Sequence, residues 1–151
     1  MFQMWGSRMI YYLNGSLMLS YLAINSFTDI KKKKIYVIVS LFFFVVGLVF
    51  SIISKQQSLI SLLGGVGIGV ILLLVGKFSR QSVGFGDGLI FLVTGLYLGF
   101  TRNIVLLLYG LIICAVSSVI LITFKKFKLK DKIPFAPFVL VAYVSMLLLE
   151  V

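Results

Sequence analysis

Long apolar segments separated by short polar gaps restrict the fold of this chain more than any other feature. Hydrophobic residues form 61 % of the 151 residues and charged residues only 12 %. Average soluble domains contain about 45–50 % apolar and about 25 % charged residues. A soluble globular domain is therefore excluded, because too few polar side chains exist to cover the apolar ones. The pattern predicts an all-α, polytopic membrane protein with a single membrane-embedded domain over residues 1–151.

Six segments approach the roughly 20 apolar residues that a transmembrane helix needs. The expected spans are Met9–Phe27, Ile35–Ile53, Leu59–Val75, Gly88–Phe100, Ile104–Phe124 and Phe135–Val151. The fourth is short, and we expect it to extend back into the preceding loop. Pro134 and Pro137 open the sixth, where proline suits a helix start.

Two of these spans carry residues that favour helix–helix contact over lipid contact. Polar side chains in the first span, which we expect to face other helices, are Asn14, Ser16, Ser20 and Asn25. Glycines in the third span, which permit close approach of another helix, are Gly64, Gly65, Gly67 and Gly69.

The basic residues occupy alternate gaps between the spans. Eleven of the 14 Lys and Arg residues fall in the first, third and fifth gaps, and three fall elsewhere. The eleven are Lys31–Lys34, Lys77, Arg80, Lys125, Lys126, Lys128, Lys130 and Lys132, and the other three are Arg8, Lys55 and Arg102. Cytoplasmic loops carry such an excess, so the odd gaps are expected in the cytoplasm and both termini outside it.

The composition also excludes several kinds of chemistry. The chain has no histidine and only one cysteine, Cys114, so histidine-based catalysis, intrachain disulfides and cysteine zinc clusters are excluded. We expect no metal and no cofactor. The formal net charge is +10, but it lies in short gaps with no soluble module. It therefore indicates topology and contact with the lipid bilayer rather than nucleic-acid binding.

Only four acidic residues exist, and two of them fall at span ends. Asp29 ends the first span and Asp87 begins the fourth, so the predicted topology places both at the cytoplasmic boundary. Two carboxyl groups that share a proton can hydrolyse a peptide bond, one activating water and the other polarising the carbonyl. Asp131 lies in a lysine run and Glu150 near the C-terminus, and we assign neither a role.

Both aspartates also have a purely structural interpretation. Asp29 beside four lysines is typical of a charge at a solvated helix end. Asp87 lies in Gly84-Phe85-Gly86-Asp87-Gly88, which is compatible with a glycine turn in which Asp87 is the helix N-cap. The same glycines, Gly84 and Gly86, permit unusual backbone angles and close approach of a substrate backbone. The spacing does not decide between these readings.

Three motifs in order resemble the type 4 prepilin peptidases and their preflagellin peptidase relatives. Gly84-Phe85-Gly86-Asp87 matches the GxGD motif, and Asp29 precedes a basic stretch that ends in Ile35. Ile133-Pro134-Phe135-Ala136-Pro137-Phe138 resembles the run that opens the family's last span. The resemblance implies that Asp29 and Asp87 are catalytic.

The chain departs from the family pattern at several positions. Tyr36 and Val37 replace a Pro-Asn pair, Leu89 stands where a lysine is usual, and Ala136 replaces a glycine. The cysteine-rich region that accompanies methyltransferase activity in many bacterial members is absent, so the sequence resembles the peptidase-only forms that serve competence pseudopilins or preflagellins.

The resemblance implies a membrane aspartic endopeptidase of the plasma membrane, with its active site facing the cytoplasm. It would remove the short basic leader of prepilin-like precursors of type IV pilus, competence or protein-secretion systems. Two alternatives belong to other classes. One is a small ion- or proton-coupled transporter using Asp29 and Asp87, and the other is a non-catalytic membrane assembly subunit.

The predicted topology can be tested by labelling single cysteines in a Cys114→Ser background. Lys33→Cys and Lys128→Cys should be shielded from an impermeant thiol reagent in intact cells, because both positions lie in cytoplasmic gaps. Gln56→Cys should label. Labelling of position 33 from outside would overturn the orientation.

Overall fold

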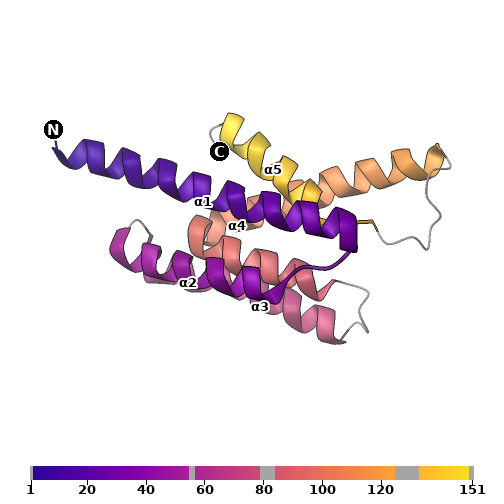
Figure 1. Cartoon of the computed structure of the whole chain (residues 1–151), viewed down its shortest axis with the longest axis horizontal. Helices are drawn as coiled ribbons and strands as arrows, with labels where there is room; N and C mark the ends of the chain where they lie inside the picture. The colour runs from indigo at the N-terminus through magenta and orange to yellow at the C-terminus, as the bar shows by residue number, and fades with distance from the viewer. Residues whose placement is uncertain (1, 55–56, 79–83, 125–132, 150–151) are drawn as a thin grey trace.

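The described part of the chain is entirely helical. The computed structural model describes residues 2–54, 57–78, 84–124 and 133–149, and these residues contain helices without strands. The helices are α1 (Phe2–Lys32), α2 (Val37–Ser54), α3 (Leu59–Phe78), α4 (Phe85–Thr123) and α5 (Ala136–Leu148). The predicted all-α class is confirmed (Figure 1).

Three of the described helices, α2, α3 and α4, are long and apolar enough to cross a membrane, and α5 is a shorter apolar helix. The chain is therefore a helical membrane protein. Much of the charge pattern that predicts the topology falls outside the described residues. These positions are Lys55, Arg80, the basic residues from Lys125 to Lys132, Asp131 and Glu150.

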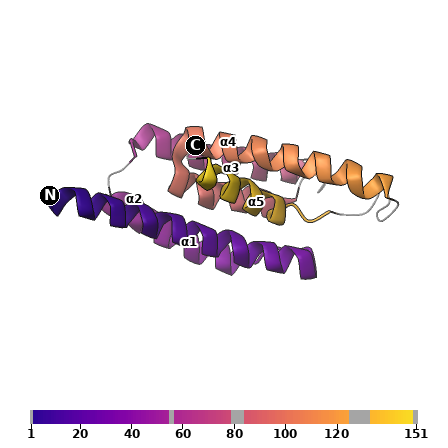
Figure 2. The ribbon, with the colours of Figure 1, turned by 90° about the horizontal axis from the view of Figure 1, so that it is seen from above.

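The structure differs from the predicted six separate helices at α4, which contains both the fourth and the fifth expected spans. Gly99 interrupts its 39 residues with φ 71° and ψ −171°. Asn103 Nδ2 donates to the Phe91 carbonyl at 3.0 Å, and Thr94 Oγ1 donates to Asn103 Oδ1 at 2.7 Å. In a straight helix, residues 91 and 103 would be about 18 Å apart along the axis. The chain therefore folds back at Gly99, as Figure 2 also shows.

The backbone groups released by this reversal have partners on other helices or on the α2–α3 connection. The Phe100 N–H donates to Ser61 Oγ at 3.2 Å. The Tyr97 carbonyl accepts from Gln57 Nε2 at 2.8 Å and from Asn14 Nδ2 at 3.3 Å. Lipid offers no hydrogen bonds to such groups, so internal partners are what allow a reversal within a membrane protein.

Glycines bring α3 and the first half of α4 into direct backbone contact. A Cβ added at Gly65 would lie 2.5 Å from the Gly95 carbonyl oxygen, and one added at Gly69 would overlap Leu92. Asn103 Nδ2 also donates to the Gly65 carbonyl at 3.0 Å, so one buried amide joins α3 to both halves of α4. The predicted close approach is confirmed at Gly65 and Gly69.

The other two glycines of α3 have different surroundings. A Cβ at Gly64 would meet the Phe100 ring, whereas one at Gly67 would meet nothing within 4 Å. The prediction of helix contact is therefore wrong for Gly67.

The polar residues of α1 divide into two groups. Asn25 is buried and Asn14 is half-buried, as predicted. Ser16 and Ser20 are exposed, so the prediction is wrong for them. Their hydroxyls donate to carbonyls of their own helix, at Leu13 and Ser16, and these bonds remove the need for a partner helix.

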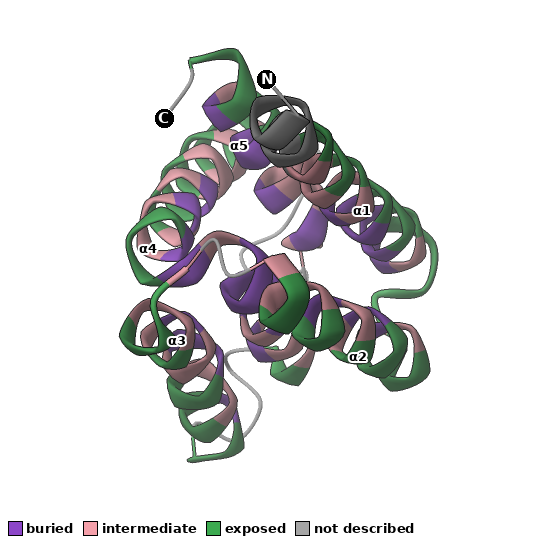
Figure 3. Cartoon of the chain, turned by 90° about the vertical axis from the view of Figure 1, so that its left-hand side faces the viewer, coloured by how far each residue is buried: buried purple, intermediate pink, exposed green. Residues whose placement is uncertain are grey.

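Buried residues lie on the inward faces of the helices and exposed residues on the outward faces (Figure 3). Helix α1 packs mainly against α5, and α2 mainly against α4, so these two consecutive helices contact each other little. The interior of the helix bundle is filled by large side chains, among which Tyr21, Phe91 and Leu106 are fully buried. The exposed outer faces are apolar, as expected of a surface in lipid.

Gly99→Ala should destabilise the protein strongly, while Gly67→Ala should not. Alanine at Gly99 would adopt a positive φ, which costs about 1–3 kcal/mol, and its Cβ would lie 2.5 Å from Ser61 Oγ. Alanine at Gly67 has open space and a better helix propensity. Thermal unfolding in detergent should give a lower midpoint for Gly99→Ala and an unchanged or higher midpoint for Gly67→Ala. Equal midpoints for the two variants would contradict the reversal.

Candidate functional site

Asp29 is a buried carboxyl group whose partner comes from the other end of the chain. It lies in the last turn of α1 with 8 % of its surface exposed. Its Oδ2 atom accepts a hydrogen bond of 3.0 Å from the backbone N–H of Ala136, the first residue of α5. A solvated charge at a helix end, the structural interpretation of Asp29, does not fit this burial.

The position of Asp29 is unfavourable within its own helix and favourable with respect to α5. A carboxylate near a helix C-terminus faces the negative end of the helix dipole, whereas the first N–H groups of a helix attract anions. The N-terminus of α5 therefore supplies the free N–H donor and the positive end of a helix dipole, which the C-terminal turn of α1 lacks. Pro137 in the first turn of α5 is compatible with this role, because a residue there has no intrahelical acceptor for its N–H.

Asp87 lies in the first turn of α4 and is half-buried. Its N–H donates to the Gly84 carbonyl at 2.9 Å, and its carboxyl group accepts a hydrogen bond from the Gly84 backbone N–H. The N-cap is Gly84. The interpretation of Asp87 as the N-cap is therefore wrong by three residues. Asp87 occupies the N3 position, from which a carboxyl group reaches back to the cap.

The structure brings the two predicted site residues together from α1 and α4. Asp29 acts electrostatically on the Asp87 carboxyl group, so the two charges lie within interaction range although 57 residues separate them in sequence. Contact between the turn that carries Asp87 and the α1–α2 connection supports this arrangement. The Gly86 α-carbon packs against Ile35, six residues after Asp29.

Gly84 and Gly86 do not have the unusual backbone angles that their sequence context suggested. Among the described glycines only Gly99 has a positive φ, and Gly84 has φ −63° and ψ 124°. Both are instead close to neighbouring groups. A Cβ at Gly86 would lie 2.7 Å from Ile35 Cδ1, and one at Gly84 would lie 2.8 Å from Asp87 Oδ2.

Polar side chains one and two turns before Asp29 extend the site along α1. Tyr21 Oη and Ser40 Oγ are 3.0 Å apart, which links α1 to α2, and Asn25 Nδ2 donates to the Tyr21 carbonyl at 2.9 Å. Asn25 Oδ1 and Ser26 Oγ are buried and without a hydrogen-bond partner in the described structure. The sequence analysis did not connect Asn25 or Ser26 with the site. The sequence did contain a signal for them. Asn25 and Ser26 lie four and three residues before Asp29, a spacing that puts all three side chains on one face of a helix.

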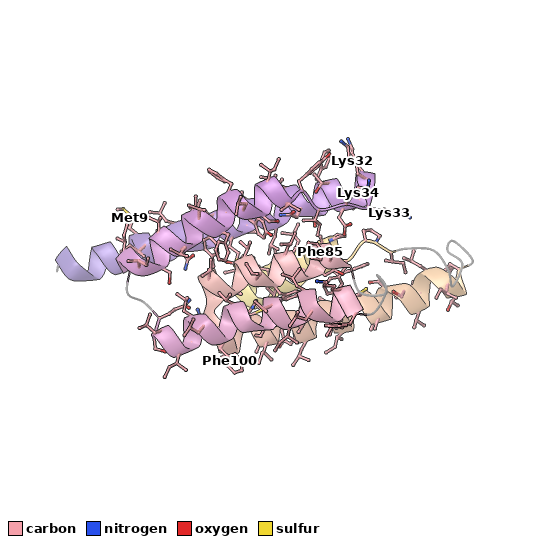
Figure 4. All side chains as sticks on the ribbon, turned by 90° about the horizontal axis from the view of Figure 1, so that it is seen from below. Met9, Lys32, Lys33, Lys34, Phe85 and Phe100 are labelled. Atoms are coloured by element: carbon pink, nitrogen blue, oxygen red, sulfur yellow. The ribbon has the colours of Figure 1, made fainter. Side chains whose placement is uncertain are left out.

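The site lies toward one end of the bundle. Figure 4 shows Lys32, Lys33 and Lys34, which follow Asp29, on the same side of the molecule as Phe85, which precedes Asp87. Met9 and Phe100 lie toward the opposite end. Within the described residues no group of three His, Cys, Asp or Glu side chains is arranged to hold a metal ion.

These features define a helical membrane protein in which two helices present interacting carboxyl groups near one end of the bundle. The model of the type IV leader peptidase family matches residues 16–119, and the chain belongs to this family. The match includes Asp29 and Asp87 but ends before Ala136. Comparison with curated proteins and with solved structures gave no match.

Proposed function

We propose that this chain is a membrane aspartic endopeptidase in which Asp29 and Asp87 form the catalytic pair. The observation that carries the proposal is the packing of Gly86, the neighbour of Asp87, against Ile35, which brings the ends of α1 and α4 that carry the two carboxyl groups together in a leader-peptidase family member. The burial of Asp29 adds support, because a buried carboxyl group is costly and is typically retained for a function.

The pair can divide the work of peptide hydrolysis between a base and an acid. One carboxylate takes a proton from the attacking water while the other, protonated, donates a hydrogen bond to the scissile carbonyl oxygen. The tetrahedral intermediate then collapses when a proton passes to the leaving amine. Two neighbouring carboxyl groups favour this division, because repulsion between like charges disfavours the state in which both are ionised. The pair titrates as a unit, so we assign neither role to one residue.

The substrates we propose are prepilin-like precursors with a short basic leader before an apolar helix. The family match supports a leader peptide as the cleaved segment. We place the site at the cytoplasmic face of the plasma membrane because Lys31–Lys34 directly follow Asp29 and basic loops stay in the cytoplasm. This topology has six crossings, with the two halves of α4 crossing separately and both termini outside.

We further propose that Gly84 and Gly86 position the substrate by leaving room for an extended backbone beside Asp87. One side of Gly86 is already filled by Ile35, so a side chain at this position would also disturb the contact between α4 and the α1–α2 connection. The two effects can be separated by changing Ile35 as well.

Asp29→Asn and Asp87→Asn should each abolish cleavage of a prepilin-like precursor by the purified protein. Asparagine keeps the size of the side chain but cannot hold or accept the shared proton. Groups that act as a unit are not additive, so the double variant should lose little more than either single one. Product formation is measured by mass spectrometry of the released leader.

Membrane insertion and the unfolding midpoint of each variant are measured in parallel, so a folding defect is recognised as such. Asp131→Asn is the matched control, because this residue lies in the lysine-rich segment and should keep near wild-type activity. Substantial cleavage by Asp29→Asn would contradict the two-aspartate mechanism.

Gly86→Val should lose cleavage while the protein still inserts, because a branched side chain closes the space beside Asp87. The discriminating comparison is Gly86→Ala with and without Ile35→Gly, which removes the Cδ1, Cβ and Cγ1 atoms nearest to the new methyl group. A substrate-positioning role predicts that the double variant stays as inactive as Gly86→Ala. Recovery of cleavage in the double variant would assign Gly86 to packing alone.

A further inference from the structure

One side-chain oxygen in α1 lacks a hydrogen-bond donor one turn before Asp29. Asn25 is 1 % exposed, and its Nδ2 atom donates to the Tyr21 carbonyl at 2.9 Å, which directs the amide nitrogen toward its own helix. The other amide atom, Oδ1, is buried and accepts no hydrogen bond in the described structure. An unpaired acceptor in such surroundings is costly, because burial removes the water that would otherwise donate to it.

The missing donor has to be a side chain packed in the bundle, because Asn25 Oδ1 has almost no surface that solvent or a ligand could reach. The four side chains one turn away on the same helix face are Tyr21, Leu22, Thr28 and Asp29. Leu22 has no polar atom. The Tyr21 hydroxyl pairs with Ser40 Oγ at 3.0 Å, and the Thr28 hydroxyl donates to the Asn25 carbonyl at 3.0 Å. Asp29 remains, and it is a donor only when its carboxyl group is protonated.

The carboxyl group of Asp29 is well placed to donate to Asn25 once it carries a proton. Side chains of a helix lean toward its N-terminus, so this carboxyl group lies over the turn that contains Asn25. Its Oδ2 atom already accepts from the Ala136 N–H at 3.0 Å. An N–H group can only donate, so it favours a proton on Oδ1 rather than on Oδ2. A protonated Oδ1 can then donate to Asn25 Oδ1 while Oδ2 keeps its hydrogen bond to Ala136.

We propose that Asn25 is a positioning residue that accepts a hydrogen bond from Asp29 whenever Asp29 holds the proton of the catalytic pair. This role rests on the proposed function, in which the cycle includes a protonated Asp29 under either division of the work. As the base, Asp29 takes its proton from the attacking water and later gives it to the leaving amine. As the acid, it holds the proton from the start and hydrogen-bonds the scissile carbonyl oxygen. Asn25 stabilises the protonated state in both cases.

Ser26 provides a comparison within the same helix turn. Its Oγ atom is also buried and without a partner, three residues before Asp29. A hydroxyl both donates and accepts, and it can rotate to donate to a carbonyl of its own helix whatever the charge of Asp29. The Asn25 oxygen can only accept, so it depends on a donor from another side chain. The proposal therefore assigns the coupling with Asp29 to Asn25 and not to Ser26.

Thermal unfolding of the full chain in detergent tests this coupling without any assay of cleavage. Asp29→Asn imitates the protonated carboxyl group, because its oxygen can accept from Ala136 while its Nδ2–H donates to Asn25 Oδ1. The change in unfolding midpoint caused by Asp29→Asn should be more stabilising, by about 2–4 °C, with Asn25 present than in an Asn25→Ala background. This is the shift expected of one hydrogen bond. Removal of a buried charge contributes equally in both backgrounds and cancels.

Two controls distinguish the proposed hydrogen bond from other effects. Asp87→Asn relieves the same repulsion between carboxyl groups but adds no donor beside Asn25, so its effect on the midpoint should be equal in both backgrounds. A Ser26→Ala background should leave the effect of Asp29→Asn unchanged. If Asn25→Ala does not fold, Asn25→Leu completes the same cycle with a larger side chain. An effect of Asp29→Asn that does not depend on Asn25 would overturn the proposal, as would an equal dependence of Asp87→Asn.

Kinetics provide a second readout that a purely structural role would not produce. Asn25→Ala should lower kcat for a prepilin-like precursor about tenfold with KM unchanged, the loss expected when one hydrogen bond is missing from the reacting state. Ser20→Ala should keep wild-type values, because this exposed hydroxyl bonds to its own helix. A wild-type kcat in Asn25→Ala would contradict the role. Retained cleavage by both aspartate variants would instead contradict the peptidase assignment, and the comparison of midpoints would still stand.

Discussion

The reversal of α4 at Gly99 is the constraint on which the arrangement of the other helices depends. A straight helix of 39 residues would extend about 58 Å, almost twice the roughly 30 Å of a bilayer's hydrocarbon core. Folding back instead lets the second half of α4 return along the first, so that α5 can begin beside Asp29. The reversal is possible because Gln57, Asn14 and Ser61 take up the backbone groups that it releases.

The site is assembled from three helix ends, none of which would be suitable alone. Asp29 occupies the unfavourable C-terminal turn of α1 and is compensated by the Ala136 N–H of α5. Asp87 occupies the favourable first turn of α4, where Gly84 donates to it. The third motif, Ile133–Phe138, thus acquires a physical role. It begins α5, whose first backbone N–H, at Ala136, donates a hydrogen bond to Asp29.

The sequence was sufficient for the features that depend on local composition and insufficient for those that depend on distant contacts. Apolar runs predicted most helix positions, and the predicted starts of α3 and α5 fall within one residue of those observed. Charge counting and motif spacing selected Asp29 and Asp87. Nothing local distinguishes Gly99, whose positive φ makes the reversal, from the twelve other glycines before it.

Contacts between residues far apart in sequence were equally inaccessible. The Ala136–Asp29 hydrogen bond joins residues 107 positions apart, and the position of Asn103 between Gly65 and Phe91 depends on the reversal itself. For Ser16 and Ser20 the sequence predicted a distant contact that does not exist. Each hydroxyl donates its hydrogen bond to a backbone carbonyl of its own helix, so neither side chain needs a partner helix.

The backbone contact between Gly65 and Gly95 has a consequence for the energetics of α3 and α4. Lipid tails solvate apolar side chains as well as a protein interior does, so helix association in a bilayer gains nothing from releasing water. The attraction at this contact comes from dispersion between closely fitted surfaces. It therefore carries none of the heat-capacity change that accompanies burial of apolar surface from water, and its strength should vary little with temperature.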